Sequence, residues 1–481
     1  MANRFSVVST AALLLLTFSQ TACGGGGGGG GGGAVTPPVT PPEPTPEVSP
    51  AVYFSKEANG IGDPNPFFEN GVFTVVYLKN EGRHPFWSTQ SPDGLSWSNP
   101  TLALSVGESP AADLWIGSGS VIADPAGGYR LFYTGHNPGA NPKEITMQAK
   151  ATSLSGPWTK TTGFGFAGTP QYDALDFRDP FVFWNSETNS YWMLLTTRQA
   201  GKAVIGRYTS PDLNTWTAEA PLYSEDSPLN LEVPDLFKQC GRWNLIYSDQ
   251  RSTSRQVRVL NADQSTGPYA YRAFDALDGK AFYAGKTAGT NDNRLLFGWL
   301  AHKRNKTDAG TFDWGGDLVT HAIKCRSDGE LAVQLPQSVA QQFAVERKSL
   351  SIGNQAIGDG AKATLTHIDV RVTPGDEFGF SFKRRNSDLT SQIRIDTQTG
   401  QAKFFLNGGS AEAPSIAFPP SSDGNYSVDL VLDPKLGLGI VYINAFRALS
   451  FRYYDVRYTD VSVYSKSAPL ALTGTVRERN P

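Results

Sequence analysis

The chain has 481 residues, of which 11% are aromatic and 18% are charged, and its formal net charge is −3. This length allows two domains after a leader is removed, and the charge balance lacks the basic footprint of a nucleic-acid-binding protein. Fifty glycines and 32 prolines favour turns and strands over helices. A nearly neutral chain rich in aromatic residues suits an uncharged ligand such as a carbohydrate.

Residues 1–23 are typical of an export signal. Arg4 supplies a positive charge, and the apolar run from 7 to 18 is shorter than a membrane-spanning helix requires. Small residues precede Cys23, as they precede the lipidated cysteine of bacterial lipoproteins, although Gln20 differs from the aliphatic residue usual at its place. We therefore expect export with a lipid anchor at Cys23, and the alternative is ordinary secretion with cleavage nearby.

Residues 24–50 predict a linker. An unbroken glycine run fills 24–33, and a segment rich in Pro, Thr and Glu continues to residue 50. Polyglycine is flexible and a proline-rich segment is stiffer, so together they predict a tether between the leader and a folded body.

Residues 51–341 predict an all-β domain with almost no helix. The clearest predicted strands are 72–78, 129–134, 191–197, 243–248 and 295–299. A turn motif also recurs: residues 91–97 read Ser-Pro-Asp-Gly-Leu-Ser-Trp and closely match 210–216, and variants close at Trp158 and Tyr269. The closing aromatic residues follow one another at steps of 61, 58 and 53 residues. A period of this size with about four strands per unit is typical of a β-propeller, and the span accommodates five blades.

Three acidic residues lie at nearly equivalent points of this repeat. The spacings are 34 residues from Asp63 to Trp97, 37 from Asp179 to Trp216 and 37 from Glu232 to Tyr269. Each acid falls at or before the first strand of its blade, which is the strand nearest the propeller axis. We therefore predict that the three acids converge at one mouth of the central channel and form an active site. In the second blade the equivalent point falls within 117–120.

Two cysteines, Cys240 and Cys325, remain beyond the leader. They can pair in an oxidising compartment or remain as two buried free thiols. Their spacing is not that of a metal site, and the five histidines are scattered without an HExxH-like pair. We expect neither a metal ion nor another cofactor.

Residues 342–481 continue as strands that alternate with a period of two and are separated by turns containing Asp-Gly, Asn-Gly and Pro. The predicted strands are 363–372, 378–383, 392–396, 402–406, 426–432 and 439–443. This pattern predicts an antiparallel β-sandwich. We expect the sandwich to support the propeller, and carbohydrate binding is the alternative role.

Five motifs, in order along the chain, resemble those of glycoside hydrolase family 32, which includes invertases, inulinases and levanases. They are Gly-Asp-Pro-Asn at 62–65, Ser-Gly-Ser at 118–120, Arg-Asp-Pro at 178–180, Glu-Val-Pro-Asp-Leu-Phe at 232–237, and the stretch at 281–286 with 296–299. The resemblance covers most of residues 55–320. It implies a five-bladed propeller followed by a C-terminal sandwich, in agreement with the repeat.

The resemblance also implies a role for each acid. Asp63 would be the nucleophile and Glu232 the general acid and then the base, while Asp179, with Arg178 beside it, would hold fructose hydroxyls. Retention of configuration predicts that the carboxyls of the first two lie about 5–5.5 Å apart. The nucleophile must stay ionised and the acid must keep its proton, so the two environments should tune the pKa values in opposite directions. Further expected sugar contacts are Asn65, Ser118, Ser120, Trp87, Trp115 and Trp314.

The sequence departs from the family pattern at three places. Gly62 stands where the family usually has asparagine, Pro66 stands where it has glycine, and the segment 77–80 lacks a glutamine that often contacts sugar. These changes leave the acids intact, but they leave the substrate preference open.

The sequence thus predicts an exported, monomeric β-fructosidase that acts on sucrose or on fructans such as inulin and levan. The alternatives are an arabinan- or xylan-directed enzyme of the family 43 type, a fructosyltransferase, and a non-catalytic glycan-binding lipoprotein. The motifs distinguish neither among sucrose, inulin and levan nor between exo and endo attack, because loops around the channel mouth decide these preferences.

Overall fold

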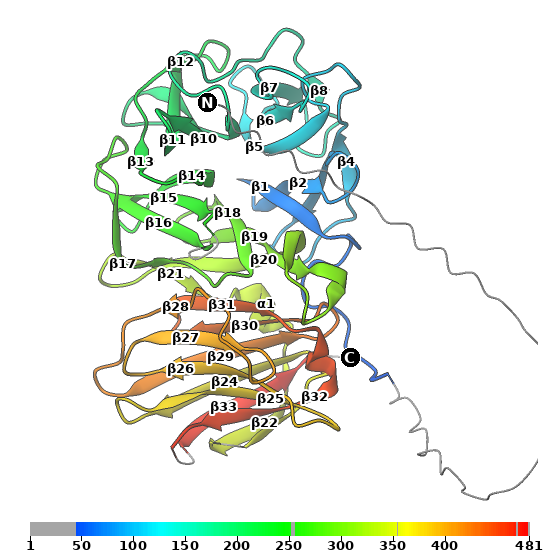
Figure 1. Cartoon of the computed structure of the whole chain (residues 1–481), viewed down its shortest axis with the longest axis vertical. Helices are drawn as coiled ribbons and strands as arrows, with labels where there is room; N and C mark the ends of the chain where they lie inside the picture. The colour runs from blue at the N-terminus through cyan, green and yellow to red at the C-terminus, as the bar shows by residue number, and fades with distance from the viewer. Residues whose placement is uncertain (1–44, 252–254, 354, 468–469, 480–481) are drawn as a thin grey trace, which may run out of the picture. The chain divides into compact units, whose positions relative to one another are not determined.

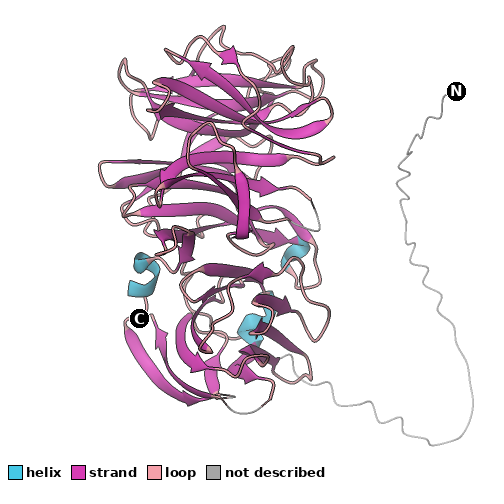
Figure 2. Ribbon diagram, turned by 90° about the vertical axis from the view of Figure 1, so that its left-hand side faces the viewer, coloured by secondary structure: helices cyan, strands magenta, loops and turns pink. Residues whose placement is uncertain are grey.

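The computed structural model describes residues 45–251, 255–353, 355–467 and 470–479. The predicted export signal, Cys23 and most of the predicted linker therefore lie outside the described residues. Strands make up nearly all of the regular structure, as Figure 2 shows. The described ranges contain three short helical segments besides the strands. None of these described helices is long and apolar enough to cross a membrane.

Five antiparallel units follow one another from residue 61 to residue 334 and correspond to the five predicted blades (Figure 1). Blade one contains β1 (Ile61–Glu69), β2 (Val72–Lys79), β3 (Phe86–Ser91) and β4 (Thr101–Leu104). Blade two contains β5 (Trp115–Ala123), β6 (Tyr129–His136), β7 (Glu144–Ala151) and β8 (Thr159–Lys160). Blade three contains β9 (Arg178–Asn185), β10 (Ser190–Gln199), β11 (Lys202–Ser210), β12 (Thr217–Ala218) and β13 (Tyr223–Glu225).

Blade four contains β14 (Leu231–Gln239), β15 (Arg242–Asp249), β16 (Val257–Ala262) and β17 (Ala270–Ala276). Blade five contains β18 (Phe282–Gly289), β19 (Arg294–Lys303), β20 (Phe312–Cys325) and β21 (Leu331–Gln334), with η1 (Arg304–Lys306) between β19 and β20. The five strands that the sequence predicted most clearly are the second strands of the five blades. These strands are buried on both faces between neighbouring blades, which is why they read as apolar runs rich in Val, Leu, Ile and aromatic residues.

The blades close into a ring. Each inner strand, the first of its blade, contacts the inner strands of both neighbouring blades, and β18 contacts β1. Blade five also pairs with blade one through a bridge between Ile61 and Gly316. The five inner strands therefore surround one axis, as the repeat predicted.

The recurring turn motif has the same local structure in blades one and three. The Asp93 carboxylate accepts hydrogen bonds from the backbone N–H groups of Leu95 (2.8 Å) and Ser96 (2.7 Å). The Asp212 carboxylate accepts the equivalent pair from Asn214 and Thr215, both at 2.8 Å. An aspartate that satisfies backbone donors two and three residues ahead stabilises a tight turn, which explains why the motif recurs.

Every inner strand carries a β-bulge, in which one extra residue faces the second strand of the blade. The bulges span 62–65 in β1, 116–119 in β5, 178–181 in β9, 232–235 in β14 and 283–286 in β18. A bulge bends its strand and redirects side chains. The three predicted acids all lie within these bulges.

The predicted sandwich consists of two six-stranded antiparallel sheets that enclose a common apolar core. A short helix, α1 (Gln337–Gln341), precedes the first sandwich strand. One sheet has the order β22 (Val345–Ile352), β33 (Ala471–Glu478), β24 (Thr364–Arg371), β29 (Asn425–Asp433), β30 (Leu438–Ile443) and β31 (Arg447–Arg452). The other has the order β23 (Ala356–Asp359), β32 (Thr459–Ser465), β25 (Glu377–Arg384), β26 (Thr390–Asp396), β27 (Gln401–Phe405) and β28 (Ile416–Ala417), with η2 (Tyr454–Tyr458) before β32.

Buried polar contacts join the sandwich to the propeller. The Arg452 side chain is fully buried and donates to the Asp317 carboxylate at 2.8 Å and to the carbonyl of Ala301 at 3.1 Å. From the propeller side, Asp278 accepts hydrogen bonds from both the backbone N–H and the hydroxyl of Ser450, each at 2.6 Å. A buried charge that lost its partner would be costly, so these pairs tie the two sheet systems together.

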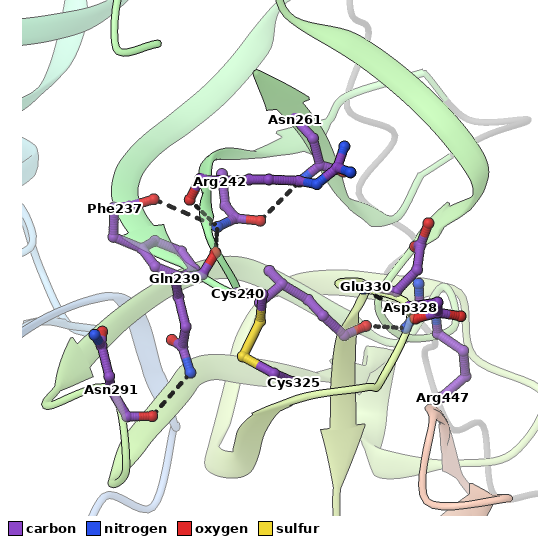
Figure 3. The surroundings of a disulfide bond; sticks show 12 residues. Phe237, Gln239, Cys240, Arg242, Asn261, Asn291, Cys325, Asp328, Glu330 and Arg447 are labelled. Carbon is purple, nitrogen blue, oxygen red and sulfur yellow. Dashed lines mark hydrogen bonds between the residues drawn. A yellow bond between two sulfur atoms is a disulfide. The ribbon is translucent and has the colours of Figure 1, made fainter. Parts of the chain in front are cut away.

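The two cysteines form a disulfide between blades four and five (Figure 3). Cys240 follows the end of β14, and Cys325 is the last residue of β20, 85 residues further along the chain. Of the two arrangements that the sequence left open, the structure therefore adopts the paired one. The bond crosslinks the turn after the inner strand of blade four to the end of the third strand of blade five.

We expect the Cys240→Ala/Cys325→Ala double variant to be less stable than the parent by about 2–4 kcal/mol, because the bond restricts the unfolded chain. Chemical unfolding followed by intrinsic fluorescence, with and without a reductant, measures this difference. The parent should lose stability in reductant and the double variant should not respond. Equal midpoints for the parent and the double variant would contradict a stabilising role.

Candidate active site

A pocket of about 840 Å³ opens where the inner strands converge. Its volume falls in the range usual for small-molecule sites. All three predicted acids line it, together with Arg178. The lining also includes the aromatic residues Tyr283, Trp299, Phe312 and Trp314. The convergence that the repeat predicted is therefore present.

The sequence spacing suggested nearly equivalent positions for the three acids. In the structure, their positions within the bulges differ. Asp63 and Asp179 are the second residues of their bulges, whereas Glu232 is the first residue of its bulge. Glu232 thus corresponds to Arg178 in blade three and to Tyr283 in blade five. The sequence spacings were counted from each acid to the closing aromatic residue of its blade. Because loop lengths differ between blades, such a count cannot reveal an offset of one residue.

The bulges hold three residues in an uncommon backbone conformation. The φ angles are 60° at Asp179, 55° at Val233 and 54° at Ala284, the second residues of three successive bulges. A positive φ is unfavourable for any residue with a Cβ and particularly for a branched one such as valine. Strain of this kind persists where the surrounding fold over-determines it, and it is concentrated at functional sites.

Three donors from three blades hold the carboxylate of Glu232. Arg178 donates from Nη2 to Oε1 at 2.9 Å, Tyr283 donates its hydroxyl to Oε2 at 2.7 Å, and Gln250 donates to Oε1 at 3.3 Å. Burial raises the pKa of the Glu232 carboxyl; Arg178 opposes this rise, and the charge of Asp179 adds to it. A carboxyl with a raised pKa is suited to hold and deliver a proton near neutral pH.

The carboxylate of Asp63 accepts a hydrogen bond at Oδ1 from the indole N–H of Trp299, at 3.1 Å. Burial raises the pKa of its carboxyl, and the negative charge of Asp179 raises it further, while Trp299 opposes the rise. The sequence had required opposite shifts for the two reacting carboxyls. In the structure both pKa values are raised, because both groups are buried in one pocket beside a third acid.

Asp179 is nearly fully buried and firmly positioned. Its Oδ2 accepts hydrogen bonds from the Thr196 hydroxyl at 2.7 Å and from the backbone N–H of Val233 at 3.2 Å. Its own N–H donates to the Thr134 hydroxyl at 2.8 Å. The adjacent guanidinium of Arg178 lies 3.9 Å from Oδ2 but is engaged more closely with Glu232.

The other predicted sugar contacts divide into two groups. Ser118 and Trp314 line the pocket with the acids. Among the described residues that line it, four predicted contacts do not appear: Asn65, Ser120, Trp87 and Trp115. The Ser120 hydroxyl is used in an inter-blade contact, since it donates to the carbonyl of Pro180 and accepts from the N–H of Val182, both at 2.8 Å.

Several lining residues were missed by the sequence reasoning. They are His84, Gln250, Arg255, Lys280, Tyr283, Trp299, Lys303 and Glu412. Tyr283 and Trp299 lie within the fifth motif, so the sequence showed which side chains are present there. It did not show that these side chains point into the pocket. Glu412 was not predictable, because it comes from the sandwich and reaches the pocket wall through an ion pair of 2.7 Å with Lys303.

The unusual Gly62 is explained by Trp314. A Cβ atom at position 62 would lie 2.2 Å from Cη2 and 2.3 Å from Cζ2 of this indole. The indole also stacks on the ring of His84, with centroids 4.3 Å apart and an interplanar angle of 16°. The amide of Asn80 donates to the Trp314 carbonyl at 3.2 Å. No side chain therefore fits at position 62 while Trp314 keeps this place beside Asp63.

Comparison with protein families gives one match that covers more than half of the chain. The model for the glycosyl hydrolases family 32 N-terminal domain matches residues 53–332. The levanase of Bacillus subtilis is 25% identical over 427 residues, which cover 77% of this chain and 60% of the levanase. The extracellular exo-inulinase of Meyerozyma guilliermondii is 22% identical over 429 residues, covering 79% of this chain and 78% of the inulinase.

Solved structures share the complete fold. The exo-inulinase from Aspergillus awamori aligns with a TM-score of 0.72 at 16% identity, covering 89% of this chain and 98% of the inulinase. The Bombyx mori beta-fructofuranosidase aligns with a TM-score of 0.69 at 18% identity, covering 91% of this chain and 94% of that enzyme. The predicted propeller followed by a sandwich is thereby confirmed.

The sequence matches to three bacterial levanases span 60%, 64% and 54% of the length of those enzymes.

We expect Gly62→Ala to destabilise the protein by about 1–3 kcal/mol, because the new methyl group must displace the Trp314 indole. The same change in a Trp314→Ala background should cost much less, and the two changes should not be additive. Urea unfolding of the four proteins measures the coupling.

Gly139→Ala serves as the control, since its Cβ would meet only an atom 3.4 Å away. A Gly62→Ala variant as stable as the Gly139→Ala variant would show that the indole does not limit position 62.

Proposed function

This chain belongs to glycoside hydrolase family 32, and on that premise we propose that it is a retaining β-fructosidase. It releases fructose or fructo-oligosaccharides from sucrose or from fructans such as levan and inulin. Relatives named levanase and exo-inulinase support this substrate class. Membership in family 32 disfavours the arabinan- or xylan-directed alternative.

The observation that carries the proposal is the meeting of three acids from three blades in one pocket beside Arg178. Glycosyl transfer with retention requires one carboxylate that attacks the anomeric carbon and one carboxyl group that protonates the leaving oxygen. A solvated, scattered set of acids could not serve this purpose. Asp179 is buried and Asp63 and Glu232 are partly buried, which supports a catalytic over a merely structural role, since acids withdrawn from solvent are rare without a reason.

In the first step, Asp63 attacks the anomeric carbon of a fructosyl unit while Glu232 gives its proton to the glycosidic oxygen. The bond to the leaving group breaks and a covalent fructosyl-enzyme forms. In the second step, Glu232 takes a proton from water, whose oxygen attacks the same carbon and releases Asp63 as a carboxylate. The contacts of Arg178 and Tyr283 with the Glu232 carboxylate support the second step, because they stabilise the ionised form that the first step leaves.

Asp179 acts as the third acid by accepting hydrogen bonds from fructose hydroxyls. The hydrogen bonds from Thr196 and from the backbone of Val233 support this role, because they fix the position of the Asp179 carboxylate. Ser118 and Trp314 are proposed as further contacts because they line the same pocket. The other expected contacts, Asn65, Ser120, Trp87 and Trp115, would then act by supporting the walls.

We also propose export of the protein, attachment to a membrane through a lipid on Cys23, and a monomeric state. The extracellular exo-inulinase among the relatives supports export. We propose that the leader is 1–23 and the linker 24–50. We divide the folded body into a catalytic propeller, 51–341, and a sandwich, 342–481, since β21 ends at Gln334 and β22 begins at Val345.

Purified residues 51–481 should release fructose or fructo-oligosaccharides from at least one of sucrose, inulin and levan, as measured by chromatography of the products. Asp63→Asn and Glu232→Gln should each lower kcat by at least about 1,000-fold, because each removes a group that forms or breaks a bond. Transfer products at high sucrose would identify a fructosyltransferase. Release of sugar from arabinan alone, or near-full activity in both variants, would overturn the proposal.

The pH dependence of kcat/KM tests the state of Asp63. Attack requires the ionised carboxylate, so the acidic limb of the profile should lie well above the ordinary aspartate pKa of about 4. Trp299→Phe removes the hydrogen bond that favours the ionised form, so the limb should move to higher pH.

Trp192→Phe is the matched control, because its indole N–H bonds to Thr188, a residue that is not among those lining the pocket. If the acidic limb of kcat/KM in Trp299→Phe stayed at the pH of the parent or moved to lower pH, this account would be contradicted.

A further inference from the structure

A lysine lies buried on the propeller axis and has no part in the steps above. Lys286 is the last residue of the bulge in β18 and is 1% exposed. Its ammonium donates to the Asn65 side-chain carbonyl at 2.7 Å, to the Ser118 hydroxyl at 3.3 Å and to the carbonyl of Gly119. These acceptors lie in blades one and two, so one side chain from blade five spans the axis.

The acceptors alone do not account for a charged residue at this place. All three are neutral, and transfer of an ammonium group from water into a protein interior is costly unless negative charge compensates it. A neutral amide could satisfy the same carbonyl and hydroxyl groups without that cost. The compensating charges are the nearby carboxylates of Asp179, Asp63 and Asp235, which act on the ammonium through space. The positive charge at this position is therefore explained by the nearby carboxylates and not by the hydrogen-bond acceptors.

We propose that Lys286 is a positioning residue whose ammonium, fixed on the axis by Asn65 and Ser118, keeps Asp63 in the ionised form that attacks the sugar. Asn65 brings the lysine close to the bulge that carries Asp63, because its side chain accepts from Lys286 and donates to the backbone carbonyl of Asp63 at 3.0 Å. The lysine touches neither the substrate nor the reacting atoms. This inference rests on the proposed function and extends it to a residue behind the pocket lining.

The charges around Asp63 come from three other blades. Asp179 in β9 and Glu232 in β14 disfavour its ionised form, and burial does so most strongly. The hydrogen bond from Trp299 in β19 favours the ionised form more strongly, and the positive charge of Lys286 in β18 adds to it. Burial in turn lowers the pKa of Lys286, while the acids hold it up. The lysine and the nucleophile thus favour each other's charged forms.

The test compares Lys286→Gln, which keeps hydrogen-bonding capacity without charge, with Lys286→Arg, which keeps the charge. In Lys286→Gln the acidic limb of kcat/KM should move to higher pH by about one unit, as expected when an opposite charge near a carboxylate is removed. The value of kcat at pH 6 should fall about tenfold, and KM should change little. Lys286→Arg should keep the limb closer to its parent position.

If Lys286 had only a structural role, Lys286→Gln would lower the unfolding temperature and leave the acidic limb of kcat/KM at the same pH. That outcome, or an unmoved limb at unchanged stability, would overturn the proposal. A direct readout separates this inference from the proposed function. Carbon-13 NMR of labelled aspartate carboxyls, with Asp63→Asn for assignment, should show a higher pKa for Asp63 in Lys286→Gln whether or not any fructan is cleaved. An unchanged carboxyl titration would exclude the role of Lys286.

Discussion

The bulge shared by the five inner strands is the constraint on which the site depends. Regular pairing would send successive side chains alternately into the two faces of each blade, where they would be buried between neighbours. One extra residue per inner strand interrupts that alternation at the same level of the ring in every blade. Polar side chains from different blades therefore meet at the axis, and the positive φ angles at Asp179 and Val233 are part of the cost of this arrangement.

The arrangement resolves into levels along each bulge. First-position residues contact one another across blades, with Glu232 between Arg178 and Tyr283. Second-position residues include Asp63 and Asp179. At the last position, Lys286 reaches Asn65 across the axis. Charges of both signs thus occupy adjacent levels, so that each acid withdrawn from solvent lies near a compensating cation.

The sandwich contributes more than support. Arg452 and Ser450 bind buried acids of the propeller, so the two sheet systems are joined by specific polar contacts as well as by apolar packing. Through its ion pair with Lys303, the sandwich residue Glu412 forms part of the pocket wall. Sequence changes in a domain without catalytic motifs can therefore alter the shape of the site.

The sequence by itself determined the five-fold repeat, the strands at the centre of each blade and the identity of the three acids, because period, alternation and short motifs are local properties of the chain. Several sandwich strands, among them β22, β31 and β33, escaped prediction. The tertiary structure alone decided that Glu232 is offset by one residue from Asp63 and Asp179, that Cys240 pairs with Cys325, and that Trp314 excludes a side chain at Gly62. It also brought Lys286 of blade five to Asn65 of blade one and Ser118 of blade two. Each of these features joins residues far apart in the sequence, such as the cysteines at a separation of 85 and Lys286 and Asn65 at 221, or depends on the direction of a side chain. Neither property is encoded in local spacing.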